Sequence, residues 1–274
     1  MHHRLGTHIR LQGSIIEAIE RAERLSIPFF QLFFVIQSSG KMIKINHDEI
    51  TFFLQKKRNF SQSLFCHGSY WINLSSLGNN GYHSLEREIA LAKRLEFPYF
   101  VLHAGSAKGA RDKNEGIDAL VRSLNRLFRQ EKDIVVLLEN TCHGNMSIGS
   151  DIKDFVLVLE KIDNPERIGF CIDTAHAYSF GHNFMSSIEC NNFIDFLDLT
   201  LGIERIKLIH LNDTQEKLGS LIDRHCVIGE GKIGLSALKQ FVTHEKLAHA
   251  PLIMELPDVS VEQEYHILEK IRWW

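Results

Sequence analysis

Hydrophobic residues in this chain gather in short runs, and six of these runs end on a histidine, an aspartate or a glutamate. The six terminal residues are His67, His103, Glu139, Asp173, His210 and Glu255. They follow one another at intervals of 36, 36, 34, 37 and 45 residues, the combined length of one strand, one helix and two loops. Two more apolar runs, over 5–9 with His8 and over 29–35, complete a set of eight predicted strands.

Amphipathic segments lie between these runs. Helical spacing of apolar residues predicts helices over 14–25, 84–95, 115–130, 151–161, 192–202, 235–245 and 261–271. The first of them begins with Ser14 and has Glu17 three residues later, which is the pattern of a capping box. A repeated alternation of strand and helix predicts parallel strands joined by crossover helices.

The polar strand ends favour a (β/α)₈ TIM barrel, an α/β fold, over an open doubly wound sheet. In a barrel the carboxyl ends of all strands surround one site, whereas an open sheet binds ligands at a single switch point. The length of 274 residues suffices, because such a barrel needs about 250. No linker or change of composition divides the chain, so we expect a single catalytic domain over residues 1–274.

Composition restricts the class of protein further. No apolar stretch approaches the length of a membrane span and the first residues do not resemble a signal peptide, so we expect a cytoplasmic protein without a membrane partner. The five cysteines form no Cys-x-x-Cys pair, which argues against a thiolate zinc site. The net charge of −3 does not exclude a phosphate-containing substrate, because carboxylates bound to cations are counted as bare negative charge.

Three further candidate ligands lie just beyond strand ends. His176 follows Asp173 by one helical turn, and Asp223 and His225 have the spacing that places two side chains on one side of an extended loop. With the six strand ends they make five histidines and four carboxylates. Nitrogen and oxygen donors without cysteine suit catalytic Zn²⁺ or Mn²⁺, and nine donors suffice for three ions if one carboxylate bridges two of them.

A single residue of this kind would carry little weight. A lone histidine at a strand end is commonly a hydrogen-bonded core residue, and a lone carboxylate commonly caps the next helix. Nine such residues at barrel-compatible positions favour metal binding, because burying four carboxylates without cations is very costly. Closely spaced ions stabilise the attacking and leaving oxygens of a phosphoryl displacement.

Several segments around these residues form specific sequence blocks. They are His-Gly-Ser69-Tyr70, Glu139-Asn140-Thr141, Cys-Ile-Asp173-Thr-Ala-His176, His210-Leu-Asn-Asp213 and Asp223-Arg-His225-Cys-Val-Ile-Gly229-Glu-Gly231. In these blocks the chain resembles the endonuclease IV family, the zinc-dependent apurinic/apyrimidinic endonucleases of DNA repair. The resemblance runs from Gly6-Thr-His8 to Glu255-Leu-Pro-Asp258, and every zinc-ligand position of the family holds the matching residue type.

The resemblance implies a TIM barrel that binds three Zn²⁺ ions. One ion would be held by His67, His103 and Glu139, and a second by Glu139, Asp173, His210 and Glu255. The third would be held by His176, Asp223 and His225. Glu139 and Glu255 would be the catalytic carboxylates. The implied reaction is attack by a metal-bridging hydroxide on the phosphate 5′ to an abasic site in double-stranded DNA, giving a 3′-hydroxyl and a 5′-deoxyribose phosphate.

Candidate DNA contacts follow the strand that ends at His67. By resemblance, the loop with Ser69, Tyr70 and Trp71 enters the minor groove at the lesion, where apolar wedges unstack bases. The second wedge position holds Trp71 where the family usually has leucine, and the two aromatic residues could instead simply cover the barrel mouth. Four basic residues on predicted loops are candidate phosphate contacts, namely Lys108, Arg111, Arg224 and Lys232.

Two loops depart from the family pattern. Ser38 stands where the family usually carries an arginine that probes the DNA stack, and Cys-His143-Gly-Asn replaces a continuation of small residues after Glu139. His143 is either an added polar group near the metals or a surface substitution. The changes leave the predicted metal ligands intact, so we expect weaker DNA bending, or a different lesion preference, than the family pattern implies.

Two other functions are compatible with the same residues. Sugar isomerases that resemble xylose isomerase also carry Glu, Asp and His at barrel strand ends, but His67, His103 and the Asp223/His225 pair would then be surplus. A non-catalytic DNA-binding relic would explain the altered second loop, but no candidate ligand has been lost. We therefore expect a monomeric zinc-dependent nuclease that acts on abasic DNA.

Overall fold

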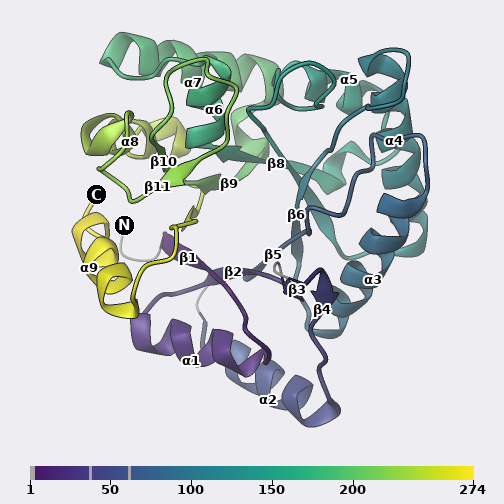
Figure 1. Ribbon diagram of the computed structural model, residues 1–274, viewed down its shortest axis with the longest axis vertical. Coiled ribbons are helices and arrows are strands. Elements are labelled where there is room, and N and C mark those ends of the chain that lie inside the picture. The colour runs from purple at the N-terminus through teal and green to yellow at the C-terminus, as the bar shows by residue number, and fades with distance from the viewer. Residues whose placement is uncertain (1–3, 37–38, 61–62) are drawn as a thin grey trace.

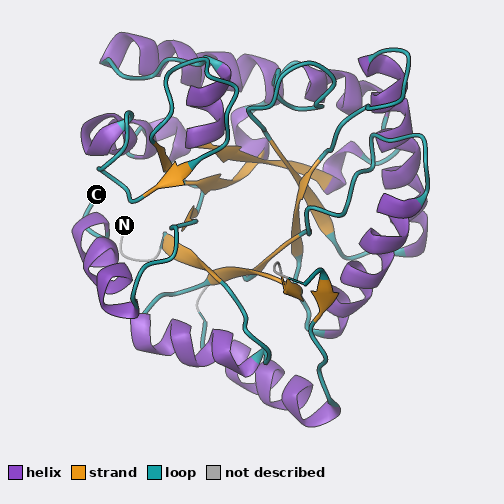
Figure 2. Cartoon of the chain, viewed as in Figure 1, coloured by secondary structure: helices purple, strands orange, loops and turns teal. Residues whose placement is uncertain are grey.

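Eight parallel strands close into a barrel at the centre of the molecule (Figures 1 and 2). The structure is a computed structural model that describes residues 4–36, 39–60 and 63–274. Around the barrel the strand order is β1-β12-β9-β8-β7-β6-β5-β2, with β2 paired to β1. The strands are β1 (Leu5–Ile9), β2 (Phe30–Phe33), β5 (Phe65–His67), β6 (Tyr99–His103), β7 (Val135–Glu139), β8 (Ile168–Asp173), β9 (Ile206–His210) and β12 (Leu252–Met254). The predicted TIM barrel is confirmed.

Register in the barrel places the polar strand ends side by side. His103 on β6 pairs with Glu139 on β7, and Asp173 on β8 pairs with His210 on β9. The strands before these ends are apolar and buried because both faces of a parallel sheet in a barrel are covered. The apolar residues of these strands thus form the buried barrel wall, and the polar residues at the strand ends gather at one mouth of the barrel.

Helices surround the barrel in the ring that Figure 2 shows in purple. Those that the sequence predicted are α1 (Ile16–Leu25), α3 (Asn80–Arg94), α4 (Lys113–Gln130), α5 (Asp154–Lys161), α7 (Ser187–Leu201), α8 (Gly234–Val242) and α9 (Val261–Ile271). Two helices were not predicted, α2 (His47–Lys57) and α6 (Thr174–Phe180). In α2 the only buried residues are Ile50 and Phe53, so its apolar periodicity is weak, although Asn46 and Glu49 form a capping box.

The start of α1 corrects one prediction. The helix begins at Ile16, its N-cap position is Ile15, and no side chain caps it. Ser14 Oγ instead accepts from Ile16 N at 3.2 Å and donates to Glu49 Oε1 on α2 at 2.7 Å. The predicted capping box is half formed: Glu17 Oε1 accepts from Ser14 N at 3.2 Å, whereas Ser14 Oγ accepts from Ile16 N and not from Glu17 N.

Two small ribbons shape the loops at the carboxyl ends of the strands. The hairpin of β3 (Val35–Ile36) and β4 (Lys41–Met42) follows β2, so the predicted run over 29–35 is divided between two elements. The ribbon of β10 (Asp213–Thr214) and β11 (His225–Cys226) brings the segment with Asp223 back to the mouth. Ser38 lies outside the described residues. In the described part of the chain, no helix is both long and apolar enough to span a membrane.

Candidate metal centre

Glu139 lies at the centre of the barrel mouth and is fully buried among four histidines. Its Oε2 atom lies 3.0 Å from His67 Nε2 and 3.1 Å from His103 Nε2. Its Oε1 atom lies 3.1 Å from His210 Nδ1 and 3.3 Å from His176 Nδ1. A single carboxylate thus faces ring nitrogens from β5, β6, β9 and α6, which is the arrangement that a bridging ligand requires.

The other carboxylates surround the same cavity. His210 Nδ1 lies 3.4 Å from Glu255 Oε2 and 3.9 Å from Asp173 Oδ2. Asp223, on the loop before β11, lies 3.2 Å from His176 and 3.3 Å from His225. The loop residues Asp223 and His225 are distant in sequence from the barrel strands, but the β10–β11 ribbon returns them to the site.

Several sets of these residues are close enough to share an ion. Their donor atoms lie within 4.8 Å of one another in four overlapping groups, namely His67/Glu139/His210, His103/Glu139/His176, Asp173/His176/His225 and Glu139/Asp173/His210/Glu255. Asp223 belongs to none of these groups and contacts His176 and His225. All nine predicted ligands are therefore brought to one mouth, where their donor atoms are close enough to hold a metal ion.

Unpaired nitrogen atoms test whether the site fits an ion. His103 Nε2 and His225 Nε2 are buried, and neither makes a hydrogen bond within the ranges the structure describes. Both face carboxylates, at 3.1 Å from Glu139 and 3.3 Å from Asp223. A buried ring nitrogen without a hydrogen bond is costly, and a metal ion satisfies its lone pair. The residues present therefore fit a cation.

The histidines and carboxylates of the cluster stabilise each other's charged forms. Burial opposes ionisation of Glu139, but the facing His103 and His210 hold the pKa of its carboxyl well below its usual range. Burial would likewise lower the pKa of His210, but Cys171, Glu255 and Glu139 raise it well above the ordinary value. The Glu139 carboxylate is thus anionic near neutral pH, the form in which it binds cations.

Three amide side chains hold the ligands and were missed by the sequence reasoning. Gln31 on β2 donates to Glu255 Oε1 at 2.8 Å, and its oxygen lies 2.9 Å from His210 Nε2. Asn140 accepts from Asp173 N at 2.7 Å. Asn212 donates to Asp173 Oδ2 at 2.6 Å and to Glu255 Oε2 at 3.2 Å. Asn140 directly follows β7 and Asn212 lies two residues beyond β9, a signal that could have identified them, whereas Gln31 has no local signal.

Replacing Asn212 by leucine, which has a similar volume, is expected to weaken metal binding about 10- to 100-fold, as loss of an outer-shell partner commonly does. Asp173 and Glu255 would lose the amide that orients both of them. Competition with a chelator of known affinity measures the change. Asn125→Leu, on α4, is the matched control, because Asn125 accepts from Asp163 N and, among the described residues, makes no contact with the metal-binding cluster. Equal metal affinity in the two variants would contradict the assignment.

The candidate DNA contacts lie at different depths. Tyr70 and Trp71 have exposed fractions of 67% and 62%. Tyr70 also lines a cavity of about 430 Å³ beside Asp223, His225 and Glu255. Ser69 is buried, and its hydroxyl faces Glu88 on α3.

The basic candidates lie in exposed loops. Lys108, Arg111 and Lys232 are exposed, and Arg224 lies 3.2 Å from Glu216. His143 is exposed as well. These positions are accessible to a large ligand that covers the barrel mouth.

Fold and site together define a TIM barrel with a cluster of metal-binding residue types at its mouth. The family described as xylose isomerase-like TIM barrel matches residues 19–274. A probable endonuclease 4 of Thermosipho melanesiensis is 31% identical over 93% of this chain and 92% of its own. An apurinic-apyrimidinic endonuclease 1 of Plasmodium berghei is 30% identical over 97% of this chain and 53% of its own. The crystal structure of endonuclease IV from Thermus thermophilus superposes with a TM-score of 0.86 at 27% identity, over 99% of this chain and 98% of that one.

The chain belongs to the endonuclease IV family. It is therefore a nuclease of the hydrolase class, and the resemblance of the sequence blocks is confirmed at the level of the family.

Proposed function

We propose that the protein is a DNA-repair phosphodiesterase that hydrolyses the bond 5′ to an abasic site in double-stranded DNA, leaving a 3′-hydroxyl and a 5′-deoxyribose phosphate. The observation that carries this proposal is the gathering of nine predicted ligands at one barrel mouth, with Glu139 among them facing four histidines. The names of the relatives support the choice of substrate.

Three Zn²⁺ ions are the proposed cofactors. His67, His103 and Glu139 would hold one ion, Glu139 with Asp173, His210 and Glu255 a second, and His176, Asp223 and His225 a third. The last two sets are supported by the short contacts of His210 with Glu255 and of Asp223 with both histidines. When bound, zinc supplies a nucleophile at neutral pH and stabilises charge on phosphate oxygens.

The chain's own residues would divide the remaining work. Glu139 would bridge two ions and Glu255 would act beside it, with Gln31 and Asn212 keeping the Glu255 carboxylate in place. Tyr70 and Trp71 would enter the duplex at the lesion, since both are largely exposed and can fill space left by an unstacked sugar. Lys108 and Arg224 would contact phosphates of the DNA. Ser69 would support the loop that carries Tyr70 and Trp71.

Incision of a labelled duplex with a tetrahydrofuran abasic analogue tests the proposal. The analogue cannot undergo β-elimination, so any cut is hydrolytic. We expect one nick 5′ to the analogue that a polymerase can extend, and no nick in the same duplex without it. Metal analysis of the same protein should find about three zinc ions per chain. One divalent ion per chain, with no nick, would contradict the proposal and favour a sugar isomerase.

A further inference from the structure

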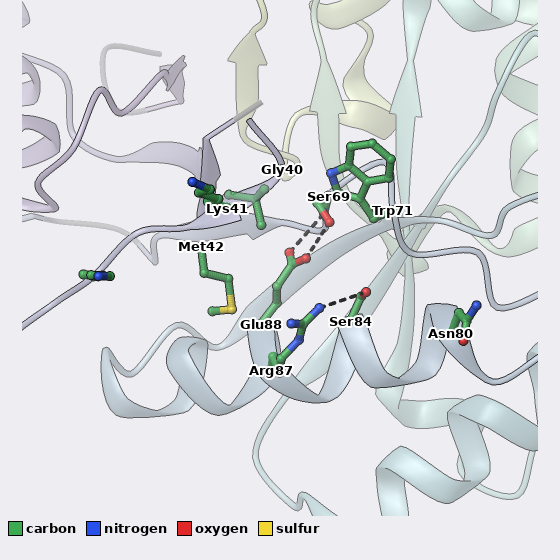
Figure 3. Close-up of a pocket in the computed structure, with 11 residues that line it drawn as sticks. Gly40, Lys41, Met42, Ser69, Trp71, Asn80, Ser84, Arg87 and Glu88 are labelled. Carbon is green, nitrogen blue, oxygen red and sulfur yellow. Dashed lines mark hydrogen bonds between the residues drawn. The ribbon is translucent and has the colours of Figure 1, made fainter. Parts of the chain in front are cut away.

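A buried carboxylate outside the metal centre holds the loop that carries the two exposed aromatic residues. Glu88 lies in the middle of α3 and is only 2% exposed. Its Oε2 atom accepts from Ser69 N at 3.0 Å and its Oε1 atom accepts from Ser69 Oγ at 2.5 Å. Figure 3 shows this pair of contacts between the helix and the loop. Both carboxylate oxygens are thus used on one residue of the loop.

The Glu88 carboxylate has no ion-pair partner in the described part of the chain. Over residues 4–36, 39–60 and 63–274, no lysine, arginine or histidine forms an ion pair with it. The neighbouring Arg87 points along the helix, and its Nη2 lies 3.4 Å from Ser84 Oγ (Figure 3). A buried carboxylate without an ion pair is costly to the fold, and hydrophobic residues could fill the same space at lower cost. The hydrogen bonds to Ser69 are therefore the interaction for which a carboxylate is needed at this position.

Ser69 controls the backbone from which Tyr70 and Trp71 project. Gly68 N donates to Val101 O at 2.8 Å on one side, and Ile72 N donates to Ser69 O at 3.0 Å on the other. Between these anchors, the exposed aromatic pair has no other backbone support in the described structure. The orientation of both side chains therefore depends on how Ser69 is held.

The surroundings leave the loop room to move if Ser69 is released. A cavity of about 650 Å³ lies between the β3–β4 hairpin, the loop and α3, and Trp71, Ser69 and Glu88 line it. The Trp71 indole lies close to Gly40, where a Cβ atom would come within 3.1 Å of Nε1 (Figure 3). Tyr70 faces the metal-side cavity instead. The two consecutive aromatic residues thus stand on opposite sides of the loop that Glu88 holds.

We propose that Glu88 is a positioning residue for DNA binding, whose carboxylate holds Ser69 and so places Tyr70 over the metal side of the mouth and Trp71 beside the β3–β4 hairpin. The inference rests on the proposed function, because it assigns the exposed aromatic pair to the DNA substrate. Among the described residues, Glu88 makes no hydrogen bond or ion pair with the predicted metal ligands, and it is almost fully shielded from solvent. It acts through Ser69.

The same contact makes the loop sensitive to pH. Burial raises the pKa of Glu88 to about 7, against the lowering effects of the Ser69 contacts and of Arg87. The other groups around it are Lys41 and Lys44 across the cavity and the Cys66 thiol on β5, whose pKa is raised by burial and by Glu88. Protonation replaces two charge-assisted hydrogen bonds by bonds between neutral groups, which are about half as strong. The hold on Ser69 therefore weakens below neutral pH.

Glu88→Gln tests the proposal, with Glu86→Gln on the same helix as the matched control. Glu86 pairs with His83 and Arg126 on the outer face and does not contact the loop. At pH 8 we expect KM for the tetrahydrofuran duplex to rise about tenfold in Glu88→Gln, the effect of losing one charge-assisted hydrogen bond, with kcat within about twofold of wild type. Glu86→Gln should match wild type in both.

Thermal stability separates positioning from a purely structural role. The raised pKa of Glu88 means that the folded protein binds its proton more tightly than the unfolded chain, so the carboxylate costs stability as pH rises from 4.5 to about 7. Glu88→Gln removes that cost, and its Tm at pH 8 should equal or exceed that of wild type. A lower Tm, with the same fractional loss in kcat as in kcat/KM, would overturn the proposal.

Trp71 fluorescence decides the question without a substrate. The chain has three tryptophans, so Trp273→Phe with Trp274→Phe leaves Trp71 as the sole reporter. We expect acrylamide quenching of Trp71 to change with a midpoint near pH 7 and this change to vanish when Glu88→Gln is added. Quenching that titrates identically with glutamine at position 88 would overturn the positioning role. Absence of incision by wild-type protein, with the Trp71 titration as expected, would instead reject the proposed function alone.

Discussion

Glu139→Gln is expected to lower kcat for incision of abasic duplex by about 10³-fold, at the upper end of losses seen when one preorganised charge-stabilising group is removed. Glu139 faces His67, His103, His176 and His210 at 3.0 to 3.3 Å, so its charge is shared by the whole mouth. Glutamine preserves the shape but is neutral and replaces one oxygen by an amide that cannot bind a cation. Single-turnover incision and zinc content measured on the same sample check this expectation.

Glu204→Gln provides the control for this variant. Glu204 is exposed, in the short 3₁₀ segment that precedes β9, at the opposite end of the barrel from the mouth. It carries the same change of charge and should retain wild-type incision and zinc content. If Glu139→Gln kept full activity while folded, Glu139 would not bridge the ions, and the proposed arrangement of the site would be wrong.

Removal of the metal is expected to abolish incision and to lower Tm. An ion present at a thousand times its Kd stabilises the folded state by about 4 kcal/mol. For a chain of this size, each kcal/mol corresponds to about 2–4 °C in Tm. We therefore expect dialysis against a chelator to lower Tm by on the order of 10 °C, and added Zn²⁺ to restore both Tm and incision. Scanning calorimetry of loaded, stripped and reloaded protein measures the shift.

Mg²⁺ added to the stripped protein serves as the control. Magnesium prefers oxygen ligands in octahedral geometry, and this mouth offers five histidines, so it should restore little of either quantity. Full recovery with magnesium would contradict a zinc site. Unchanged incision after complete removal of the metal would contradict metal catalysis altogether.

The Tm of the metal-free protein should depend on pH in a way that the Tm of the metal-bound protein does not. Burial opposes protonation of His176 and His210, but the facing carboxylates raise the pKa of both well above 6.5. A histidine of this kind stabilises the fold below its unfolded value and loses that effect as pH rises through the folded pKa. Tm of the stripped protein should therefore fall as pH rises above 6.5. In the loaded protein, where the ions need neutral histidines, it should not.

Secondary structure was predictable where the local pattern was strong. The strands that end at His103, Glu139, Asp173 and His210 are continuous apolar runs, and their positions agree with β6 to β9. Helix α2 was missed because only Ile50 and Phe53 mark its buried face. The capping-box pattern at Ser14 and Glu17 predicted the contact of Glu17 with Ser14 N, but it could not show that Ser14 Oγ accepts from Ile16 N and donates to Glu49 of a neighbouring helix.

The sequence by itself determined the barrel and the residues that surround its mouth, since strand ends of a parallel barrel must converge and these strands end in metal-binding side chains. Tertiary structure alone decided which atoms meet. The pairing of Asp223 with His176 depends on a ribbon that folds a loop back, and the roles of Gln31 and Glu88 depend on partners 224 residues and 19 residues away. Such contacts are set by packing between distant segments, and no local pattern of residues carries that information.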